Sequence, residues 1–136
     1  MTDYASHLAA ALTRSDTVTP EDTVRAYFAA YSEGRPDRFD EIVSADYIDY
    51  GHTPPGRGPK GARDDYENAV DLAGGVIRYD IDALVARENT VAAAWTGRLE
   101  SGSEFRGLSL YAVAEGRIAE VRRALIGELP GEFRQP

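Results

Sequence analysis

Four alternating segments separated by short turns fill the second half of the chain, and they restrict the fold more than any other feature. Residues 76–87, 90–100, 104–114 and 117–126 are separated by Glu88-Asn89, Ser101-Gly102-Ser103 and Glu115-Gly116. A period of two is typical of β-strands, and such short connections join neighbouring antiparallel strands. The pattern predicts three consecutive hairpins in one strongly curved sheet. In its first strand, one face is expected to carry Ile77, Tyr79, Ile81, Ala83 and Val85.

The first half of the chain carries helical patterns instead. Thr19-Pro20-Glu21-Asp22 combines a capping residue, a proline suited to the first helical position and two acids in the first turn. Apolar residues then recur with helical spacing up to Gly34. Further helices are expected over 3–14, from Pro36 and within 61–74, with a short strand over 46–50. Helices followed by strands indicate the α+β class, with N-terminal helices packed on a curved, mostly antiparallel sheet.

Composition narrows the possible functions. A chain of 136 residues is expected to form one domain, here 19–130, with 1–18 as a helical extension and 131–136 as a tail. A net charge of −8 disfavours nucleic acid and anionic membranes as partners. The absence of cysteine excludes disulfides and thiol chemistry, and two histidines exclude a three-His metal site. We expect no cofactor, no metal, no signal peptide and a cytoplasmic location.

The turn positions predict which side chains share a face of the sheet. A two-residue turn at Glu115-Gly116 pairs Tyr111 with Glu120 and Ser109 with Arg122. One face, expected to be concave and covered by helices, then holds Val91, Ala93, Trp95, Leu99, Phe105, Ser109, Tyr111, Val113, Ile118, Glu120 and Arg122. A single β-bulge would reverse part of this assignment.

Several short segments resemble one fold family. Residues 24–31 (VRAYFAAY), 45–50 (ADYIDY) and 116–121 (GRIAEV) resemble the first helix, first strand and last strand of the nuclear transport factor 2-like fold. The loop 54–63 (PPGRGPKGAR) resembles that of SnoaL-like polyketide cyclases. The resemblance covers roughly residues 20–128 and implies a cone-shaped α+β barrel. It does not fix the activity, because the scaffold carries isomerases, cyclases, epoxide hydrolases and binding proteins.

Three active sites of this family match the chain only in part. Tyr27 matches the tyrosine of ketosteroid isomerases, but Gly51 and Ser109 stand where their base and acid are expected. His52 matches the histidine of SnoaL-like aldol cyclases, whereas Arg122-Arg123-Ala124 replaces their last-strand aspartate. Tyr50-Gly51-His52 and Arg98-Leu99-Glu100 are similar to motifs of limonene-type epoxide hydrolases, whose second aspartate also falls on arginine.

Five residues are candidates for the chemistry. His52 is expected to be a general acid/base, because imidazole titrates near neutral pH, or else an exposed loop residue. Asp49 would be a general base if buried, or a solvated strand acid. Tyr50, like Tyr27, could donate a hydrogen bond to an oxyanion. Arg122 is expected to stabilise negative charge with Glu120 as an acid/base, or to form a structural ion pair with it.

A second set, mainly aromatic, is expected to bind substrate. These residues could stack on a planar ligand or could simply form the core. They are Tyr27, Tyr31, Tyr66, Trp95, Ser109 and Tyr111. Residues 56–61 match G-x-G-x-x-G, but they follow no βαβ strand and contain Pro59, so we interpret them as a loop at the edge of the pocket rather than a dinucleotide site.

Three functions remain open at this point. The first is a cofactor-independent acid/base enzyme of SnoaL-like type on a hydrophobic, oxygenated small molecule, with a polyketide or natural-product cyclase as the most specific interpretation. The second is an epoxide hydrolase or epoxide-opening cyclase, in which Glu100 or Glu120 would act beside a tyrosine. The third is a non-catalytic cone that binds a small molecule. Relatives often dimerise through the convex face, which predicts a homodimer through Leu108, Leu110 and Val121.

Overall fold

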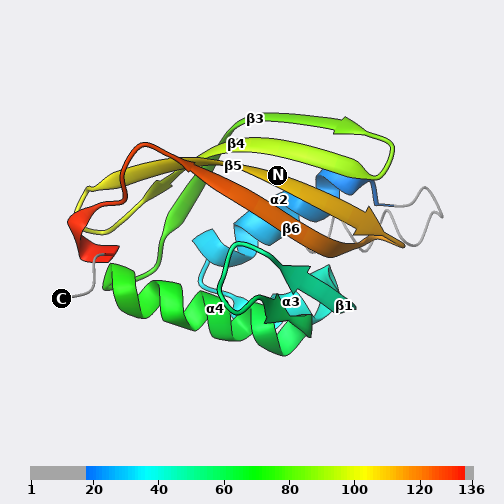
Figure 1. Cartoon of the computed structure of the whole chain (residues 1–136), viewed down its shortest axis with the longest axis horizontal. Coiled ribbons are helices and arrows are strands. Elements are labelled where there is room, and N and C mark those ends of the chain that lie inside the picture. Colours follow the sequence, from blue (N-terminus) through cyan, green and yellow to red (C-terminus); the bar gives the residue numbers. More distant parts are fainter. Residues whose placement is uncertain (1–17, 134–136) are drawn as a thin grey trace.

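The computed structural model describes residues 18–133, in which helices lie on one side of a single curved sheet (Figure 1). The helices are α2 (Pro20–Ser32), α3 (Phe39–Ile42) and α4 (Gly58–Ala73), with short 3₁₀ turns η1 (Pro36–Arg38) and η2 (Gly131–Phe133). The strands are β1 (Val43–Asp49), β2 (Gly56–Arg57), β3 (Arg78–Arg87), β4 (Thr90–Arg98), β5 (Glu104–Ala114) and β6 (Arg117–Ile126). The predicted helix 3–14 lies outside the described residues.

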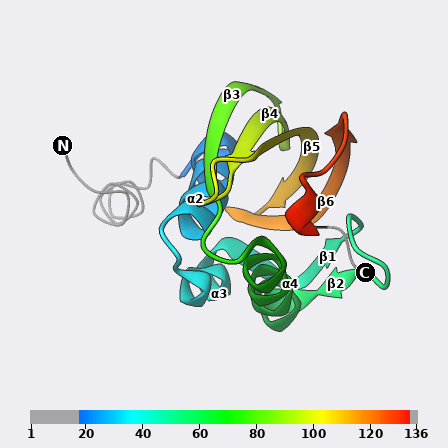
Figure 2. The same ribbon diagram turned by 90° about the vertical axis from the view of Figure 1, so that its left-hand side faces the viewer.

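The sheet confirms the predicted fold class. Its strand order is β2-β1-β6-β5-β4-β3, in which β3 to β6 form the expected antiparallel meander and β1 pairs in parallel with β6. The meander curls over α2, with α3 and α4 below it (Figure 2). The sheet is therefore mixed and unclosed, and its concave face is turned toward the helices.

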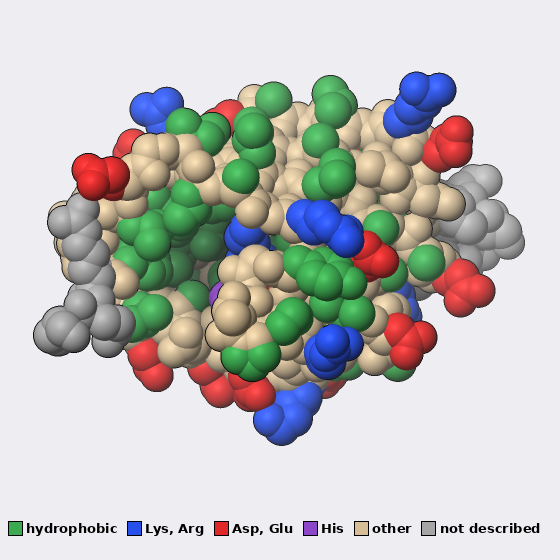
Figure 3. Space-filling view, in the orientation of Figure 1, with side chains coloured by type: hydrophobic (Ala, Val, Ile, Leu, Met, Phe, Trp, Pro, Cys, Tyr) green, Lys and Arg blue, Asp and Glu red, His purple; other side chains and the backbone are tan. Residues whose placement is uncertain are grey.

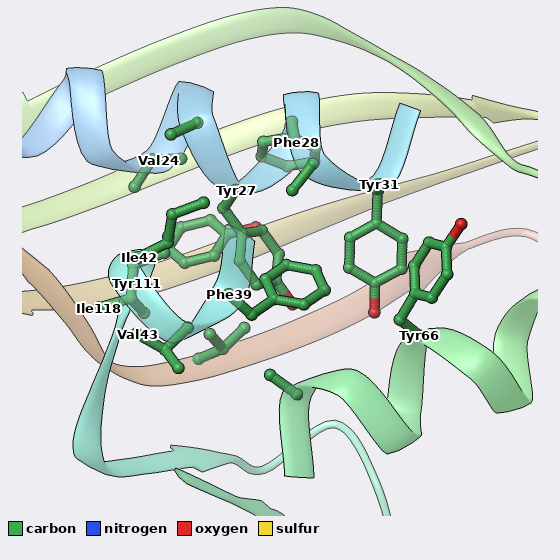
Figure 4. Packing of buried hydrophobic residues seen from close by; sticks show 14 of the residues in the cluster. Val24, Tyr27, Phe28, Tyr31, Phe39, Ile42, Val43, Tyr66, Tyr111 and Ile118 are labelled. Carbon is green, nitrogen blue, oxygen red and sulfur yellow. The ribbon is translucent and has the colours of Figure 1, made fainter. Parts of the chain in front are cut away.

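Helix α2 begins where the sequence predicts. The Thr19 hydroxyl accepts a hydrogen bond from the Asp22 N–H (3.1 Å), and the Asp22 carboxylate accepts one from the Thr19 N–H (3.3 Å). This reciprocal capping box satisfies two backbone donors that the first turn leaves free. The apolar face of α2 points Tyr27 and Tyr31 toward α3, α4 and the sheet, where they meet other rings (Figure 4).

A β-bulge in β6 changes which of its side chains face inward. Val113 pairs with Ile118 as predicted, but the register then shifts, so that Tyr111 pairs with Val121 and Ser109 with Arg123. The extra residue on β6 reverses the alternation beyond it. Val121 is buried and Arg123 faces the interior, whereas Glu120 and Arg122 do not. The expectation that Glu120 and Arg122 face the interior is therefore wrong, as is the placement of Val121 on the convex face.

A second bulge lies in β3. The register of β3 against β4 shifts between Ile81 and Ala83, so Leu84 packs on the core while Val85 is 68% exposed. The predicted alternation therefore holds only for the first half of this strand. Between β4 and β5, a turn at 101–103 predicts that Trp95 pairs with Ser109, but Trp95 pairs with Gly107. This shift of two residues leaves both faces unchanged. No helix in residues 18–133 combines the length and apolar character needed to span a bilayer.

Candidate functional site

A cavity of about 380 Å³ lies between the helices and the concave face of the sheet. Figure 3 shows a hollow lined by hydrophobic side chains, with a basic and a histidine side chain at its edge. The lining comes from α2, α4, the loop after β1, the sheet and the C-terminal segment. It comprises Tyr27, Phe28, Tyr31, Gly51, His52, Asn68, Ala69, Leu72, Ile77, Tyr79, Trp95, Phe105, Ser109, Tyr111, Arg123, Leu125, Leu129 and Phe133.

Glycines in the sheet make room for the aromatic wall of this cavity. A Cβ on Gly107 would collide with the indole of Trp95, and one on Gly97 would lie 2.6 Å from the ring of Phe105. The two rings meet edge to face, with their centroids 5.5 Å apart. The indole N–H of Trp95 donates a hydrogen bond to Ser109 Oγ (2.8 Å), which satisfies its polar group inside the apolar wall.

The polar end of the cavity is organised around a buried carboxylate. Asp49, at the end of β1, is only 1% exposed. Its Oδ1 accepts a hydrogen bond from the Gly51 N–H (2.8 Å), and its Oδ2 accepts one from Arg123 Nη2 (2.5 Å). A buried carboxylate needs such partners, because its desolvation is otherwise too costly. The bulge in β6 thus places the Arg123 guanidinium next to the Asp49 carboxylate.

Tyrosine hydroxyls extend this polar network. The Tyr47 hydroxyl donates to Asp49 Oδ2 (3.3 Å) and lies 3.4 Å from the Tyr27 hydroxyl, to which Arg123 Nη2 donates at 3.5 Å. Burial raises the pKa of Tyr27 and Tyr47 well above the ordinary value, and it raises the pKa of Tyr79 to about 12. These hydroxyls therefore keep their protons at neutral pH and remain hydrogen-bond donors.

His52 lies between two carboxylates at the wall of the cavity. Its Nε2 is 3.5 Å from Asp49 Oδ2 and 3.5 Å from Asp65 Oδ2, a residue of α4. Neither contact is a hydrogen bond, so His52 Nε2 and Asp65 Oδ2 are buried without hydrogen-bond partners among the described residues. Burial raises the pKa of Asp65; a positive charge on His52 lowers it, and Asp49 adds to the increase.

This cluster is better suited to a proton than to a metal ion. Donor atoms of Asp49, His52 and Asp65 lie within 4.8 Å of one another, a spacing that a cation could bridge. However, both oxygens of Asp49 already accept hydrogen bonds, and the Arg123 guanidinium beside them repels a second positive charge. The same surroundings favour a proton shared between these side chains, because a proton needs less space than a metal ion and carries only a single charge.

The structure brings many of the predicted site residues together. Tyr27, Tyr31, His52, Trp95, Ser109 and Tyr111 line the cavity, and Asp49 lies beneath its polar end. Tyr66 does not line the cavity; it is buried against Tyr31, with ring centroids 5.2 Å apart. The other three lie outside: the Arg122 guanidinium stacks 4.4 Å over the exposed ring of Tyr50 and pairs with Glu120 (2.7 Å).

Two charged residues of the site are not among the candidates that the sequence predicts. Alternation without the bulge in β6 places Arg123 on the opposite face. The adjacent pair Arg122-Arg123 contained a signal, since one of the two must face inward whatever the register. Asp65 is not a candidate from the sequence either, because an acid near the start of a predicted helix is explained by the helix dipole alone. The local sequence pattern does not show that the loop after β1 folds back toward α4, where His52 lies next to Asp65.

An α+β cone with an aromatic cavity and ionisable groups at one end defines the class of nuclear transport factor 2-like proteins. Within this class the chain belongs to the family of SnoaL-like domains, whose sequence model matches residues 24–121. No curated protein matches the sequence significantly. The similarity to solved structures is therefore the remaining comparison.

Three solved structures illustrate that similarity. IdmH from Streptomyces antibioticus, described as a candidate polyketide cyclase, is 18% identical over 79% of this chain and 92% of its own, with a TM-score of 0.68. A candidate polyketide cyclase from Sinorhizobium meliloti is 17% identical over 76% and 94% (TM-score 0.67). A candidate SnoaL-like isomerase from Agrobacterium tumefaciens is 20% identical over 77% and 95% (TM-score 0.68). At these identities the comparison shows a shared fold.

Proposed function

We propose that the protein is a cofactor-independent acid/base enzyme that acts on a hydrophobic, oxygenated small molecule. The observation that carries the proposal is His52, placed at the cavity wall with Nε2 facing two carboxylates and Arg123 nearby. Carboxylates beside one ring nitrogen hold an imidazole in place, which leaves the other nitrogen for a substrate. We therefore assign the substrate to Nδ1.

The chemistry that fits these groups is proton abstraction next to a carbonyl. His52 takes the proton as the C–H bond breaks, and the electron pair moves onto the carbonyl oxygen. Tyr27 and Arg123, both in the cavity lining, are the donors available to the resulting enolate oxygen. In a cyclisation, the enolate carbon attacks a second carbonyl of the same molecule. Protonated His52 then returns its proton to the new alkoxide.

The most specific form of this proposal is a polyketide or natural-product cyclase. It is supported by the SnoaL-like family and by neighbours described as candidate polyketide cyclases. The cavity wall is also consistent with it, because Trp95 and Phe105 contribute apolar ring surface against which a planar, oxygen-bearing chain could pack. An enzyme with this assignment needs no redox partner, since proton transfer and carbon–carbon bond formation leave the electron count unchanged.

The direct test is a comparison of wild type with His52→Ala on a panel of β-polyketone esters and cyclic ketones. We expect turnover by wild type and a loss of at least 100-fold in the variant, because general acid/base catalysis contributes about 10²–10⁴-fold. Circular dichroism would verify that the variant is folded. A folded His52→Ala protein with full activity would remove His52 from the mechanism.

Epoxide opening is the second candidate, favoured by one observation. The Asp49 carboxylate lies beside the Tyr47 hydroxyl and Arg123, so the structure does contain a carboxylate close to a tyrosine. Asp49 is not the carboxylate that the sequence predicts for epoxide opening, which is Glu100 or Glu120. Hydroxy-epoxides incubated in ¹⁸O-labelled water would show label in the product if water opens the ring. Thermal stabilisation by a ligand without any product would support a non-catalytic cone instead.

A further inference from the structure

The C-terminal segment 127–133, expected from the sequence to lie partly in a tail, forms part of the cavity wall. Leu129 and Phe133 both line the cavity, and the ring of Phe133 meets that of Phe105 edge to face, with centroids 5.2 Å apart. In Figure 1 the red turn η2 lies beside the end of α4 and the turn between β4 and β5. The segment thus closes the end of the cavity farther from Asp49.

Glu132 fastens this segment to the sheet. Its Oε2 accepts hydrogen bonds from Ser101 Oγ (2.5 Å) and Ser103 Oγ (3.2 Å), two residues of the β4–β5 turn. The hydrogen bond from Ser101 holds the pKa of Glu132 below its ordinary value, so the carboxylate is charged at neutral pH. These groups are exposed, and hydrogen bonds in water contribute little net stability. The attachment therefore sets the position of the segment but contributes little to the free energy of folding.

The register of β5 shows how far this wall is from the polar end. Ser109 pairs with Arg123, and Phe105 lies four residues earlier on the same face of β5. At about 3.3 Å per residue, roughly 13 Å separate the two positions. A ligand with its oxygenated end at Arg123 and His52 therefore directs its apolar end toward Phe105, Leu129 and Phe133.

We propose that Leu129 and Phe133 determine the length of ligand that the cavity accepts, and that Glu132 holds them in position through Ser101 and Ser103. The ligand class is an elongated molecule with an oxygenated head and an apolar tail, in which the tail ends against the C-terminal segment. This inference rests on the proposed binding cavity, but it does not depend on catalysis by His52.

The test uses 2-naphthol and its 6-butyl and 6-octyl derivatives as probes of increasing length. Isothermal titration calorimetry measures the Kd of each probe, because the naphthol ring absorbs and emits in the same wavelength range as Trp95. We expect wild type to bind the butyl probe more tightly than the octyl probe. Phe133→Ala should shift this ratio at least 10-fold toward the octyl probe and change the Kd of 2-naphthol less than 3-fold. Arg87→Ala, which truncates an exposed side chain at the end of β3 and outside the cavity lining, is the matched control.

The attachment is tested with the same probes. Glu132→Gln and the double variant Ser101→Ala/Ser103→Ala should each reduce the discrimination against the octyl probe. Combining the three substitutions should cause no further reduction, because each variant already removes the same hydrogen-bonded connection. Glu67→Gln, a charge change on the exposed face of α4, should leave the ratio unaltered. Equal length preference in wild type and Phe133→Ala would overturn the inference, as would the absence of saturable binding by all three probes. Inactivity of the wild type with length-dependent binding intact would contradict the proposed catalysis alone.

Discussion

At the scale of single residues, the site consists of neighbouring charged and ionisable side chains. Arg123 neutralises Asp49, and His52 lies next to Asp49 and Asp65, so two carboxylates share one guanidinium and one imidazole. The balance leaves room for one more proton in the cluster. Gly56 leaves room for this arrangement, because a Cβ at that position would collide with Asp65 Oδ2.

The raised pKa of Asp65 predicts a pH-dependent stability difference. The folded protein holds the proton of Asp65 to higher pH than the unfolded chain, whose carboxyl titrates near 4. Stability from this group is present below that pH and is lost as the pH rises through the raised folded-state pKa. Asp65→Asn should therefore gain stability relative to wild type as the pH rises from about 4. Urea denaturation across the pH range measures this difference.

A control variant separates burial from charge. Asp64→Asn removes the same charge from the neighbouring position of α4, where the carboxylate is exposed and pairs with Lys60 at 2.7 Å. An exposed carboxylate has no burial penalty, so the trend seen with Asp65→Asn should be absent. If instead Asp65→Asn lost stability relative to wild type with rising pH, attraction to His52 would outweigh burial and the account of this carboxyl would be wrong.

At the scale of secondary-structure elements, the sequence predicts elements better than their registers. The meander, the start of α2 at Pro20 and the loop before α4 follow from turn residues, caps and periodicity, which are local. The bulges in β3 and β6 do not, because they depend on how each strand fits the curvature of the whole sheet. The bulge in β6 places Arg123 rather than Arg122 in the site. The sequence alone therefore predicts the wrong arginine as the buried cation.

The register of β6 is tested by a pair of adjacent substitutions. Arg123→Ala leaves Asp49 buried without its cation and should lower the free energy of unfolding by about 3 kcal/mol or more. Arg122→Ala removes only an exposed pair with Glu120 and a stacking contact with Tyr50, so a much smaller loss is expected. Chemical denaturation of both variants gives the comparison. The opposite order would mean that Arg122, as alternation without a bulge predicts, is the inward residue.

At the scale of the whole molecule, the convex face of the sheet carries several exposed apolar side chains. Leu108 and Leu110 are 50% and 46% exposed, and they border an apolar groove together with Val85. We propose that two copies associate through this face. Sedimentation velocity should show a dimer for wild type and a monomer for Leu110→Glu, with unchanged circular dichroism. A monomeric wild type at all accessible concentrations would remove this proposal.

The proposed chemistry requires His52 to exchange protons with a carbon acid held in the cavity. The most direct measurement is deuterium incorporation by mass spectrometry, with wild type and His52→Ala incubated in heavy water with cyclic ketones and β-polyketone esters. We expect enzyme-dependent deuterium at a carbon next to a carbonyl with wild type and its loss in the variant. Binding of these compounds without any exchange by wild type, or equal exchange by both proteins, would contradict it.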